Sequence, residues 1–401
     1  MEVASAVHSV VGFLRLQTHF ERLSAGPFFL STRPRKVKVP LPRYHRHHHH
    51  PISNHLSNGG CTVNRASVIV NSTSATTAAE GSLSEVENIK QKCLTWQWKG
   101  HYSINYFVSS DADDSPPPLL LVHGFGASIP HWRRNIKTLA ENYTVYAIDL
   151  LGFGASDKPP GFQYTMETWA QLILDFLNEV IQKPTVLIGN SVGSLACLIA
   201  ASDSSQTLVR GIVLLNCAGG MNNKAIVDDW RIKLLLPLLW LFDFLLNQNG
   251  IASAIFERVK QRENLRNILS SVYGNKESVD EELVEIIREP ANDSGALEAF
   301  VSIVTGPPGP NPVQLMPKIS LPVLLLWGDQ DPFTPIDGPV GKYFSSLPSQ
   351  QENVKLFLLE GVGHCPHDDR PDLVHEKLLP WLATLSNSQQ SVKHSQAASS
   401  Y

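Results

Sequence analysis

Short apolar runs alternate with amphipathic stretches along the middle of the chain. Several of these runs are apolar at nearly every position, which is typical of strands buried on both faces of a sheet. Strands are predicted at residues 119–122, 144–149, 186–189, 209–215, 322–327 and 354–359. Residues 95–98 and 102–106 instead alternate around Gly100, which predicts a β-hairpin ahead of the first buried strand.

Helical periodicity separates these strands. In the clearest case, from Thr165 to about Gln182, apolar residues recur along one stripe, as expected for a helix that covers a sheet. Strands alternating with helices predict an α/β fold with a mainly parallel, doubly wound sheet. This core is expected over residues 90–217 and 313–385, and the polar residues 386–401 are expected to form a disordered tail.

The pattern changes between residues 218 and 312. Nothing in this stretch resembles a strand, and it ends at Gly306–Pro312, whose glycines and prolines are incompatible with a helix. We therefore predict a helical cap inserted between two core strands, which a chain of 401 residues can accommodate. Helices are expected in the cap at residues 228–246, 251–267, 280–288 and 295–304.

Residues 1–79 differ in composition from the rest of the chain. They are rich in Ser, Thr, Asn and His and hold nine of the 33 basic residues but only two of the 37 acidic residues. An Arg- and Ser-rich N-terminus that is poor in acids is typical of an organelle transit peptide. We expect residues 1–79 to be a transit peptide and a disordered linker, with the folded body starting near Lys92 and the histidine run at 47–50 solvated.

The remaining 24 basic and 35 acidic residues give the body an acidic balance without a basic stripe. This balance argues against nucleic acid as a partner. The five cysteines are scattered and include no Cys-x-x-Cys pair. The sequence therefore predicts neither a disulfide framework nor a zinc site.

A serine stands at the centre of the pattern Gly189-Asn190-Ser191-Val192-Gly193. An apolar run precedes this pattern, and small, helix-forming residues follow it. Gly-x-Ser-x-Gly between a strand and a helix is typical of the nucleophile elbow of α/β-hydrolases, in which a tight turn exposes the serine. The sequence therefore predicts an α/β-hydrolase fold with Ser191 as the nucleophile.

A serine hydroxyl needs a base to take its proton and an acid to orient that base. In α/β-hydrolases the acid and then the histidine follow the serine along the chain. Asp331 and His364 each follow a predicted strand, at the sheet edge where active-site groups of α/β proteins lie. We predict His364 as the base and Asp331 as the acid, with Asp329 as the rival acid.

Two backbone N–H groups are expected to hold the oxyanion of the reaction. One belongs to Val192, the residue after the nucleophile, and the other to Phe125 in the glycine-containing loop that follows strand 119–122. The neighbouring His123 is predicted to be structural rather than the general base.

Three alternative chemistries can be set aside from the residues. An acid after the preceding strand is excluded because Asn216 and Cys217 stand there. Epoxide hydrolases and dehalogenases of this fold carry Asp at the position of Ser191. Cys365 would need a base of its own and is more simply explained by packing.

The cap contains the apolar stretch 234–246, interrupted by Pro237 and Asp243. Its 13 residues are too few to span a membrane. The stretch is either a buried cap helix or an apolar lid that binds an apolar substrate and contacts a membrane surface. On the second interpretation its aromatic residues are substrate-binding: Trp240, Phe242 and Phe244.

Beyond these motifs, the chain resembles the plant chlorophyll dephytylases, chloroplast α/β-hydrolases related to pheophytinase. The resemblance covers residues 90–385, and the cap and linker stretches are its specific part. The similar stretches are residues 189–197, the cap entry 216–224, the linker 306–312 and residues 361–366.

The resemblance implies hydrolysis of the phytyl ester of chlorophyll to chlorophyllide and phytol. It also implies a location in the chloroplast with peripheral thylakoid membrane contact. No cofactor or metal is expected, because the magnesium belongs to the substrate. The alternatives are a pheophytin-preferring enzyme, another lipophilic carboxylesterase or acyltransferase, and a ligand receptor built on a hydrolase scaffold.

Overall fold

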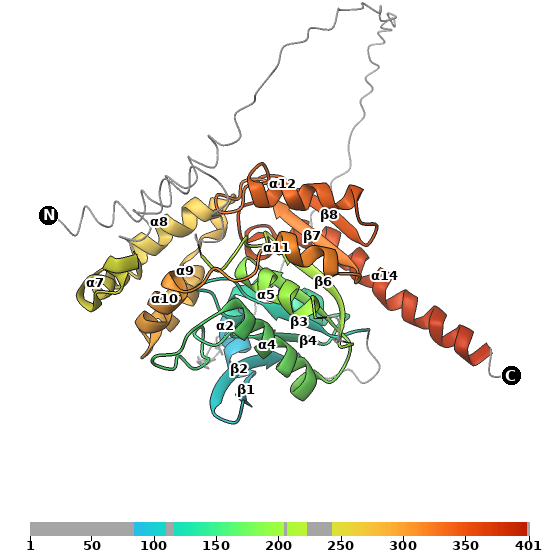
Figure 1. Cartoon of the computed structure of the whole chain (residues 1–401), viewed down its shortest axis with the longest axis horizontal. Coiled ribbons are helices and arrows are strands. Elements are labelled where there is room, and N and C mark those ends of the chain that lie inside the picture. The colour runs from blue at the N-terminus through green and yellow to red at the C-terminus, as the bar shows by residue number, and fades with distance from the viewer. Residues whose placement is uncertain (1–83, 110–115, 204–206, 223–242, 399–401) are drawn as a thin grey trace, which may run out of the picture. The chain divides into compact units, whose positions relative to one another are not determined.

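The structure is a computed structural model that describes residues 84–109, 116–203, 207–222 and 243–398. Its centre is an eight-stranded sheet with the strand order β1-β2-β4-β3-β5-β6-β7-β8 (Figure 1). β2 pairs antiparallel with β1 and β4, and all other neighbouring strands are parallel. The strands are β1 (Cys93–Trp98), β2 (Tyr102–Val108), β3 (Leu119–Val122), β4 (Val145–Ile148), β5 (Thr185–Asn190), β6 (Val209–Leu215), β7 (Val323–Gly328) and β8 (Val354–Leu359).

The central strands are buried on both faces. Every residue of β3, β5 and β7 is buried. Successive side chains of a strand point to opposite faces, so Leu119 and Leu121 enter one hydrophobic core while Leu120 and Val122 enter the other. This double burial explains why these strands are continuous apolar runs, and the predicted mainly parallel α/β sheet is confirmed.

Helices cover both faces of the sheet. Residues of α4, α5, α11 and α12 pack into the core on one face, and residues of α2, α3 and α14 pack into the core on the other. These helices and one short helix after β8 are α2 (Glu85–Gln91), α3 (Arg133–Ala140), α4 (Met166–Phe176), α5 (Val192–Ala201), α11 (Pro312–Leu315), α12 (Pro339–Ser346), α13 (Pro366–Asp369) and α14 (Pro371–Ala398).

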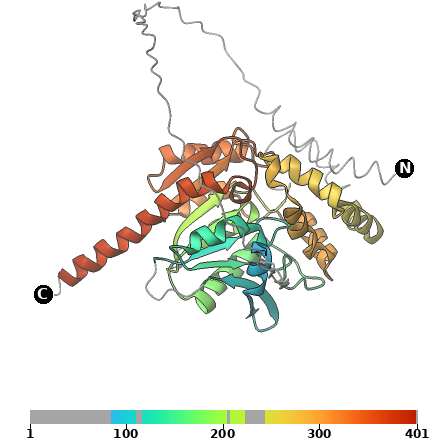
Figure 2. The ribbon, with the colours of Figure 1, turned by 180° about the vertical axis from the view of Figure 1, so that it is seen from behind.

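Four further helices lie between β6 and β7 in the described part of the chain. They are grouped on one side of the sheet (Figures 1 and 2). The segment after the last of them returns to the start of the insertion, where the Met221 N–H donates to Pro308 O at 2.7 Å. These helices are α7 (Asn249–Val259), α8 (Arg262–Val272), α9 (Glu281–Arg288) and α10 (Ala296–Thr305).

The cap departs from the predicted helices at one place. The single helix expected at 251–267 is two helices, because Gln261 has extended backbone at the start of α8. The Asn264 side chain stabilises this break by donating to Arg258 O at 2.7 Å. No local sequence pattern predicts this hydrogen bond. The helix expected at 228–246 lies largely outside the described residues.

The ends of the body also differ from expectation. The body begins with α2, before Lys92, and Ser84 and Glu87 form a capping box at its start. The predicted disordered tail is wrong as far as residue 398, because α14 continues past Leu385 to Ala398. No glycine or proline interrupts residues 386–398, so nothing local stops the helix. The predicted transit peptide and linker, residues 1–79, lie outside the described residues.

No helix within the described ranges has both the length and the apolar character needed to cross a membrane.

Candidate active site

Ser191 occupies a strained turn between β5 and α5. Its φ of 55° lies in the left-handed region, which is costly for a residue with a side chain. A Cβ added at Gly189 would lie 2.5 Å from the backbone nitrogen of Ser194, and one at Gly193 would lie 2.3 Å from the carbonyl oxygen of His123. The two glycines therefore permit the close approach of strand, turn and helix that the elbow requires.

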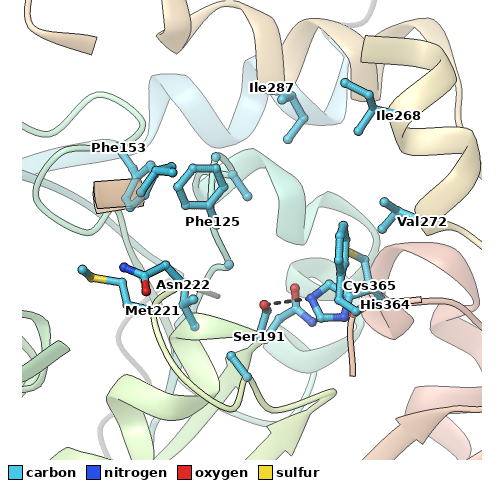
Figure 3. Close-up of a pocket in the computed structure, with 18 of the residues that line it drawn as sticks. Phe125, Phe153, Ser191, Met221, Asn222, Ile268, Val272, Ile287, His364 and Cys365 are labelled. Atoms are coloured by element: carbon cyan, nitrogen blue, oxygen red, sulfur yellow. Dashed lines mark hydrogen bonds between the residues drawn. The ribbon is translucent and has the colours of Figure 1, made fainter. Parts of the chain in front are cut away.

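The structure brings the three predicted triad residues together. His364 Nε2 lies 2.8 Å from Ser191 Oγ (Figure 3), and His364 Nδ1 lies 2.8 Å from Asp331 Oδ2. Asp331 and His364 follow β7 and β8, so both stand at the carboxyl ends of parallel strands. All three residues are buried.

Asp331 is held as an acceptor for the histidine. Its Oδ1 accepts the backbone N–H groups of Phe333 and Thr334 at 2.7 and 3.1 Å. Its Oδ2 accepts the Thr334 hydroxyl at 2.5 Å and Asn216 Nδ2 at 2.6 Å. Burial alone would raise the pKa of Asp331, but His364 and these side-chain hydrogen bonds lower it below the ordinary aspartate value. The carboxylate therefore favours the tautomer with hydrogen on Nδ1, which leaves Nε2 free to accept from the serine.

Asn216 is a site residue that the sequence prediction missed. Its Oδ1 accepts the Gly328 N–H at 3.0 Å, which turns its Nδ2 toward Asp331. The sequence shows only that this position offers no carboxylate. The rival acid Asp329 is engaged elsewhere, since its Oδ1 accepts the Gly361 N–H at 2.8 Å.

The loop after β3 lies directly against the nucleophile. A Cβ added at Gly124 would lie 3.3 Å from Ser191 Cβ. His123 fixes this loop, because its Nδ1 lies 2.7 Å from Gly124 O and its Nε2 accepts the Leu150 N–H at 3.1 Å. Burial lowers the pKa of His123, so a neutral ring fits both contacts. Phe125 follows in the loop, and the N–H of Val192 lies in the first turn of α5, where it needs no partner within the helix.

Ser191 and His364 open into a cavity of about 530 Å³. Its walls come from the loop after β3, the start of the insertion and cap helices α7 to α10, and most of the lining side chains are apolar. Phe244, predicted to bind substrate, is 61% exposed and does not line this cavity. The prediction for Phe244 came from composition alone, which cannot give the direction of a side chain. Trp240 and Phe242 lie outside the described residues.

The cap is bonded directly to the loop that carries His364. The backbone N–H of His364 donates to Val272 O at the end of α8, at 3.0 Å. Asp369 accepts three backbone N–H groups, from Gly363 at 2.6 Å and from the cap residues Gly274 and Asn275 at 2.8 Å each. A cap segment 94 to 95 residues before Asp369 in the chain thus helps to fix the histidine, and the sequence prediction missed Asp369.

Replacing Asp369 with asparagine is expected to lower kcat for ester hydrolysis about 10- to 100-fold, because a small displacement of a catalytic group is costly. An amide offers one acceptor oxygen in place of two, so it cannot hold Gly363 and both cap residues. Asp372→Asn is the matched control, since Asp372 is largely exposed and forms its ion pair with Arg370, away from Gly363 and the cap residues. Equal kcat values for the two variants, measured on one ester, would contradict this positioning role.

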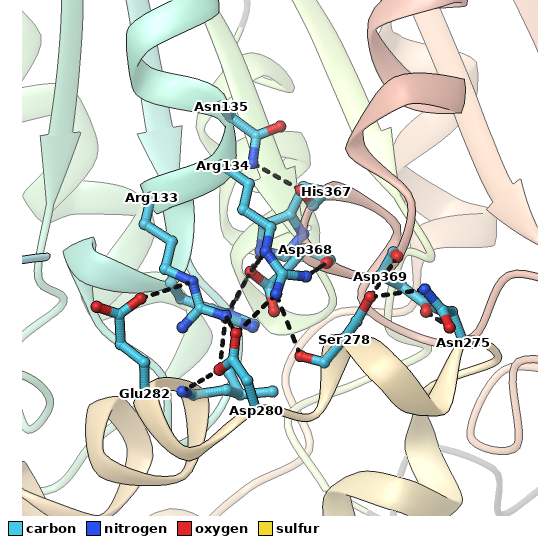
Figure 4. Close-up of polar contacts among 12 residues, drawn as sticks. Arg133, Arg134, Asn135, Asn275, Ser278, Asp280, Glu282, His367, Asp368 and Asp369 are labelled. Carbon is cyan, nitrogen blue, oxygen red and sulfur yellow. Dashed lines mark hydrogen bonds and ion pairs between the residues drawn. The ribbon is translucent and has the colours of Figure 1, made fainter. Parts of the chain in front are cut away.

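A partly buried polar network joins the cap, at the start of α9, to the core (Figure 4). Arg133 and Arg134 of α3 both donate to Asp280 at the start of α9, at 2.8 to 3.0 Å. Each also lies 3.6 Å from Oδ1 of the buried Asp368. Burial raises the pKa of Asp368 to about 6, against the opposing effect of the two arginines.

Two neutral histidines complete this network. His367 Nε2 lies 3.3 Å from His131 Nδ1, and His131 Nε2 lies 2.7 Å from the Tyr273 hydroxyl, which donates to Asp368 at 3.1 Å. Burial lowers the pKa of His131 to about 3 and lowers that of His367 well below its ordinary value. Asp368 is therefore the group in this network whose charge changes in the weakly acidic range.

The raised pKa of Asp368 predicts a pH-dependent stability. The folded protein binds this proton more tightly than the unfolded chain, so stability falls as pH rises from about 4 to about 6 and then stays low. Relative to Asp368→Asn, the wild type is expected to lose up to about 3 kcal/mol over that range. Urea unfolding from pH 4 to pH 7 measures the difference, and Asp372→Asn, which keeps Asp368, should lose stability over this range as the wild type does.

The cysteines of the described body are unsuited to nucleophilic catalysis. Burial raises the pKa of Cys365 well above its ordinary value, and it does the same for Cys197 and Cys217. Cys365 packs beside Val272 and Phe333, in agreement with the prediction of a packing role. Within the described ranges no group of three or more His, Cys, Asp or Glu is arranged to hold a metal ion.

The mainly parallel sheet and the serine turn between a strand and a helix define a hydrolase fold. The chain belongs to the alpha/beta hydrolase fold family, whose profile matches residues 117–371. It is 26% identical over 333 residues to the chloroplastic pheophytinase of Arabidopsis thaliana, a match that covers 73% of this chain and 66% of pheophytinase. It is also 26% identical over 282 residues to the uncharacterised hydrolase YugF of Bacillus subtilis, covering 70% of this chain and 94% of YugF.

Solved structures agree on the fold. A serine hydrolase involved in carbazole degradation, CarC, superposes with a TM-score of 0.56 at 20% identity, covering 73% of this chain and 98% of that chain. The epoxide hydrolase CorEH superposes with a TM-score of 0.57 at 22% identity, covering 73% and 99%. At these identities the likeness establishes the architecture and leaves the substrate open.

Proposed function

We propose that the protein is a serine hydrolase of carboxylic esters. The observation that carries this proposal is the hydrogen-bonded chain from Ser191 through His364 to Asp331, at the wall of an apolar cavity. A serine whose hydroxyl contacts an oriented imidazole can give up its proton as it attacks a carbonyl carbon.

In the first half of the reaction, Ser191 Oγ attacks the ester carbonyl and His364 Nε2 takes the serine proton. The carbonyl oxygen becomes an oxyanion, which accepts from the backbone N–H groups of Phe125 and Val192. His364 then gives the proton to the alcohol oxygen as the carbon–oxygen bond breaks. In the second half, His364 takes a proton from water, the resulting attack on the acyl-enzyme frees the acid, and the proton returns to Ser191.

Within this class, the proposed substrate is the phytyl ester of chlorophyll, giving chlorophyllide and phytol. The resemblance to chlorophyll dephytylases and the 26% identity to a plant pheophytinase support this choice. The largely apolar cavity supports it as well. Burial stabilises a hydrocarbon by about 0.8 kcal/mol per CH₂ group, so an apolar cavity can compete with a lipid phase for a long chain. The composition of residues 1–79 adds a chloroplast location to the proposal, with contact at the thylakoid surface.

Separate incubations with chlorophyll a and pheophytin a, with chromatographic resolution of the products, test the proposal. Release of phytol and chlorophyllide from chlorophyll supports it. If neither pigment loses phytol while simple esters are cleaved, the chlorophyll assignment is wrong and a general carboxylesterase remains.

Pheophytin is the second candidate substrate, and the match to pheophytinase is the observation that favours it. The two pigments differ in the central magnesium and not in the ester. A preference must therefore arise from contacts with the ring system rather than from the triad. Phytol release from pheophytin alone would establish this alternative.

A further inference from the structure

The cavity has two chemically different sides, with Ser191 between them (Figure 3). On the His364 side stand Val272 and Ile268 of α8 (Figure 3). Val272 packs in one cluster with Leu269 and Ile287, and the rings of Tyr273 and Phe333 join this cluster next to His364. The Val272 carbonyl accepts the backbone N–H of His364. The part of this side that α8 and α9 form consists of branched aliphatic side chains.

The side away from His364 is aromatic. Phe125 and Phe153 lie there (Figure 3), with ring centroids 5.7 Å apart. The Phe125 ring is also 6.0 Å from that of Phe300 on α10, which lies 5.3 Å from that of Phe256 on α7. Phe125 is 42% exposed although it lines the cavity, so part of its ring is free to contact a bound molecule.

The proton transfer decides which half of an ester lies on which side. His364 Nε2 must protonate the departing alcohol oxygen, so that oxygen lies within hydrogen-bond reach of the imidazole. The oxyanion occupies the N–H groups of Phe125 and Val192. The remaining substituent of the tetrahedral carbon, the acyl chain, therefore extends away from His364 toward the aromatic side.

We propose that the α8 side binds the alcohol half of the substrate and the Phe125–Phe300 side binds a flat, conjugated acyl half. This assignment rests on the proposed ester hydrolysis and adds its substrate polarity. Branched aliphatic walls offer dispersion contacts to a branched alkyl chain, whereas the half-exposed Phe125 ring, backed by Phe300, offers stacking to a planar ring system. The site thus selects a long branched alcohol esterified to a planar acid and disfavours the reverse arrangement.

Two ester series on the full-length protein test the assignment. In the first, the acid is acetate and the alcohol is hexanol or phytol. In the second, the alcohol is ethanol and the acid is decanoate or pyrenebutyrate. Ile268→Ala is expected to lower kcat/KM for phytyl acetate, relative to hexyl acetate, about tenfold. Its ratio between the two ethyl esters should not change.

Phe300→Leu keeps an apolar side chain and removes the ring, so it is expected to affect the acyl series and not the alcohol series. The kcat/KM for ethyl pyrenebutyrate, relative to ethyl decanoate, should fall about tenfold, and the ratio between the two acetates should hold. Ile251→Ala is the matched control for Ile268→Ala, because Ile251 is 38% exposed on α7 and does not line the cavity. It should move neither ratio.

The two proposals fail in different ways. If Ile268→Ala moves the acyl ratio and Phe300→Leu moves the alcohol ratio, or if each variant moves both ratios equally, the assignment is overturned even when chlorophyll is cleaved. If no pigment is cleaved but the model esters show the expected asymmetry, the chlorophyll proposal fails and the assignment stands.

Discussion

Ser191→Ala is expected to lower kcat for ester hydrolysis about a million-fold. The hydroxyl lies 2.8 Å from His364 Nε2 and is the atom that would bond to the substrate carbon. Alanine removes that atom, and without it the histidine can activate only water that is not held at the same place. Substrate binding should change little, since the cavity walls come from other residues. The loss should therefore fall on kcat rather than on KM.

Steady-state kinetics on one soluble ester and on the pigment measure this effect, and a fluorophosphonate probe provides an independent assay. The probe should label the wild-type protein at Ser191 and leave the alanine variant unlabelled. Ser349→Ala is the matched control, because Ser349 is exposed and its hydroxyl donates to Ser346 O. Hydrolysis that survives in Ser191→Ala, with labelling at another residue, would refute the nucleophile assignment.

The part of the fold that could be predicted is the part encoded by local signals. The run Leu119–Val122 is buried on both faces of the sheet, as its four consecutive apolar residues predict. The elbow is similar, since Gly189 and Gly193 are required by close approaches within one short segment. The order of serine, acid and histidine then placed the remaining triad residues at strand ends.

Contacts between distant segments could not be predicted. Asp369 accepts the N–H of Gly274, and Asn216 donates to Asp331 across 115 residues of sequence. Neither residue carries a motif, because its role depends on which backbone it meets in the folded protein. The prediction that Phe244 lines the substrate site was wrong for the same reason, since an apolar composition does not specify in which direction a side chain points.

The distinction between Asp331 and Asp329 is a question that the sequence left open and the structure makes testable. The two carboxylates are two residues apart at the end of β7. Asp331 lies 2.8 Å from the imidazole, and Asp329 instead accepts the Gly361 N–H. Asp331→Asn is therefore expected to lower kcat about ten-thousand-fold, whereas Asp329→Asn should remain within a few-fold of the wild type.

The size of the Asp331 effect follows from the tautomer of His364. The carboxylate accepts from Nδ1, and an amide that keeps its oxygen toward the N–H groups of Phe333 and Thr334 would turn its NH₂ toward the ring. The imidazole would then carry its hydrogen on Nε2, the atom that must accept the serine proton.

A pH profile of kcat separates this effect from general damage to the loop. Asp331→Asn should lose activity at neutral pH and recover part of it at high pH, where hydroxide can assist removal of the serine proton. Two results would show that the carboxylate at 331 does not orient the histidine. One is a pH profile of Asp331→Asn that has the wild-type shape and is lower by the same factor at every pH. The other is an equal loss of kcat in Asp329→Asn.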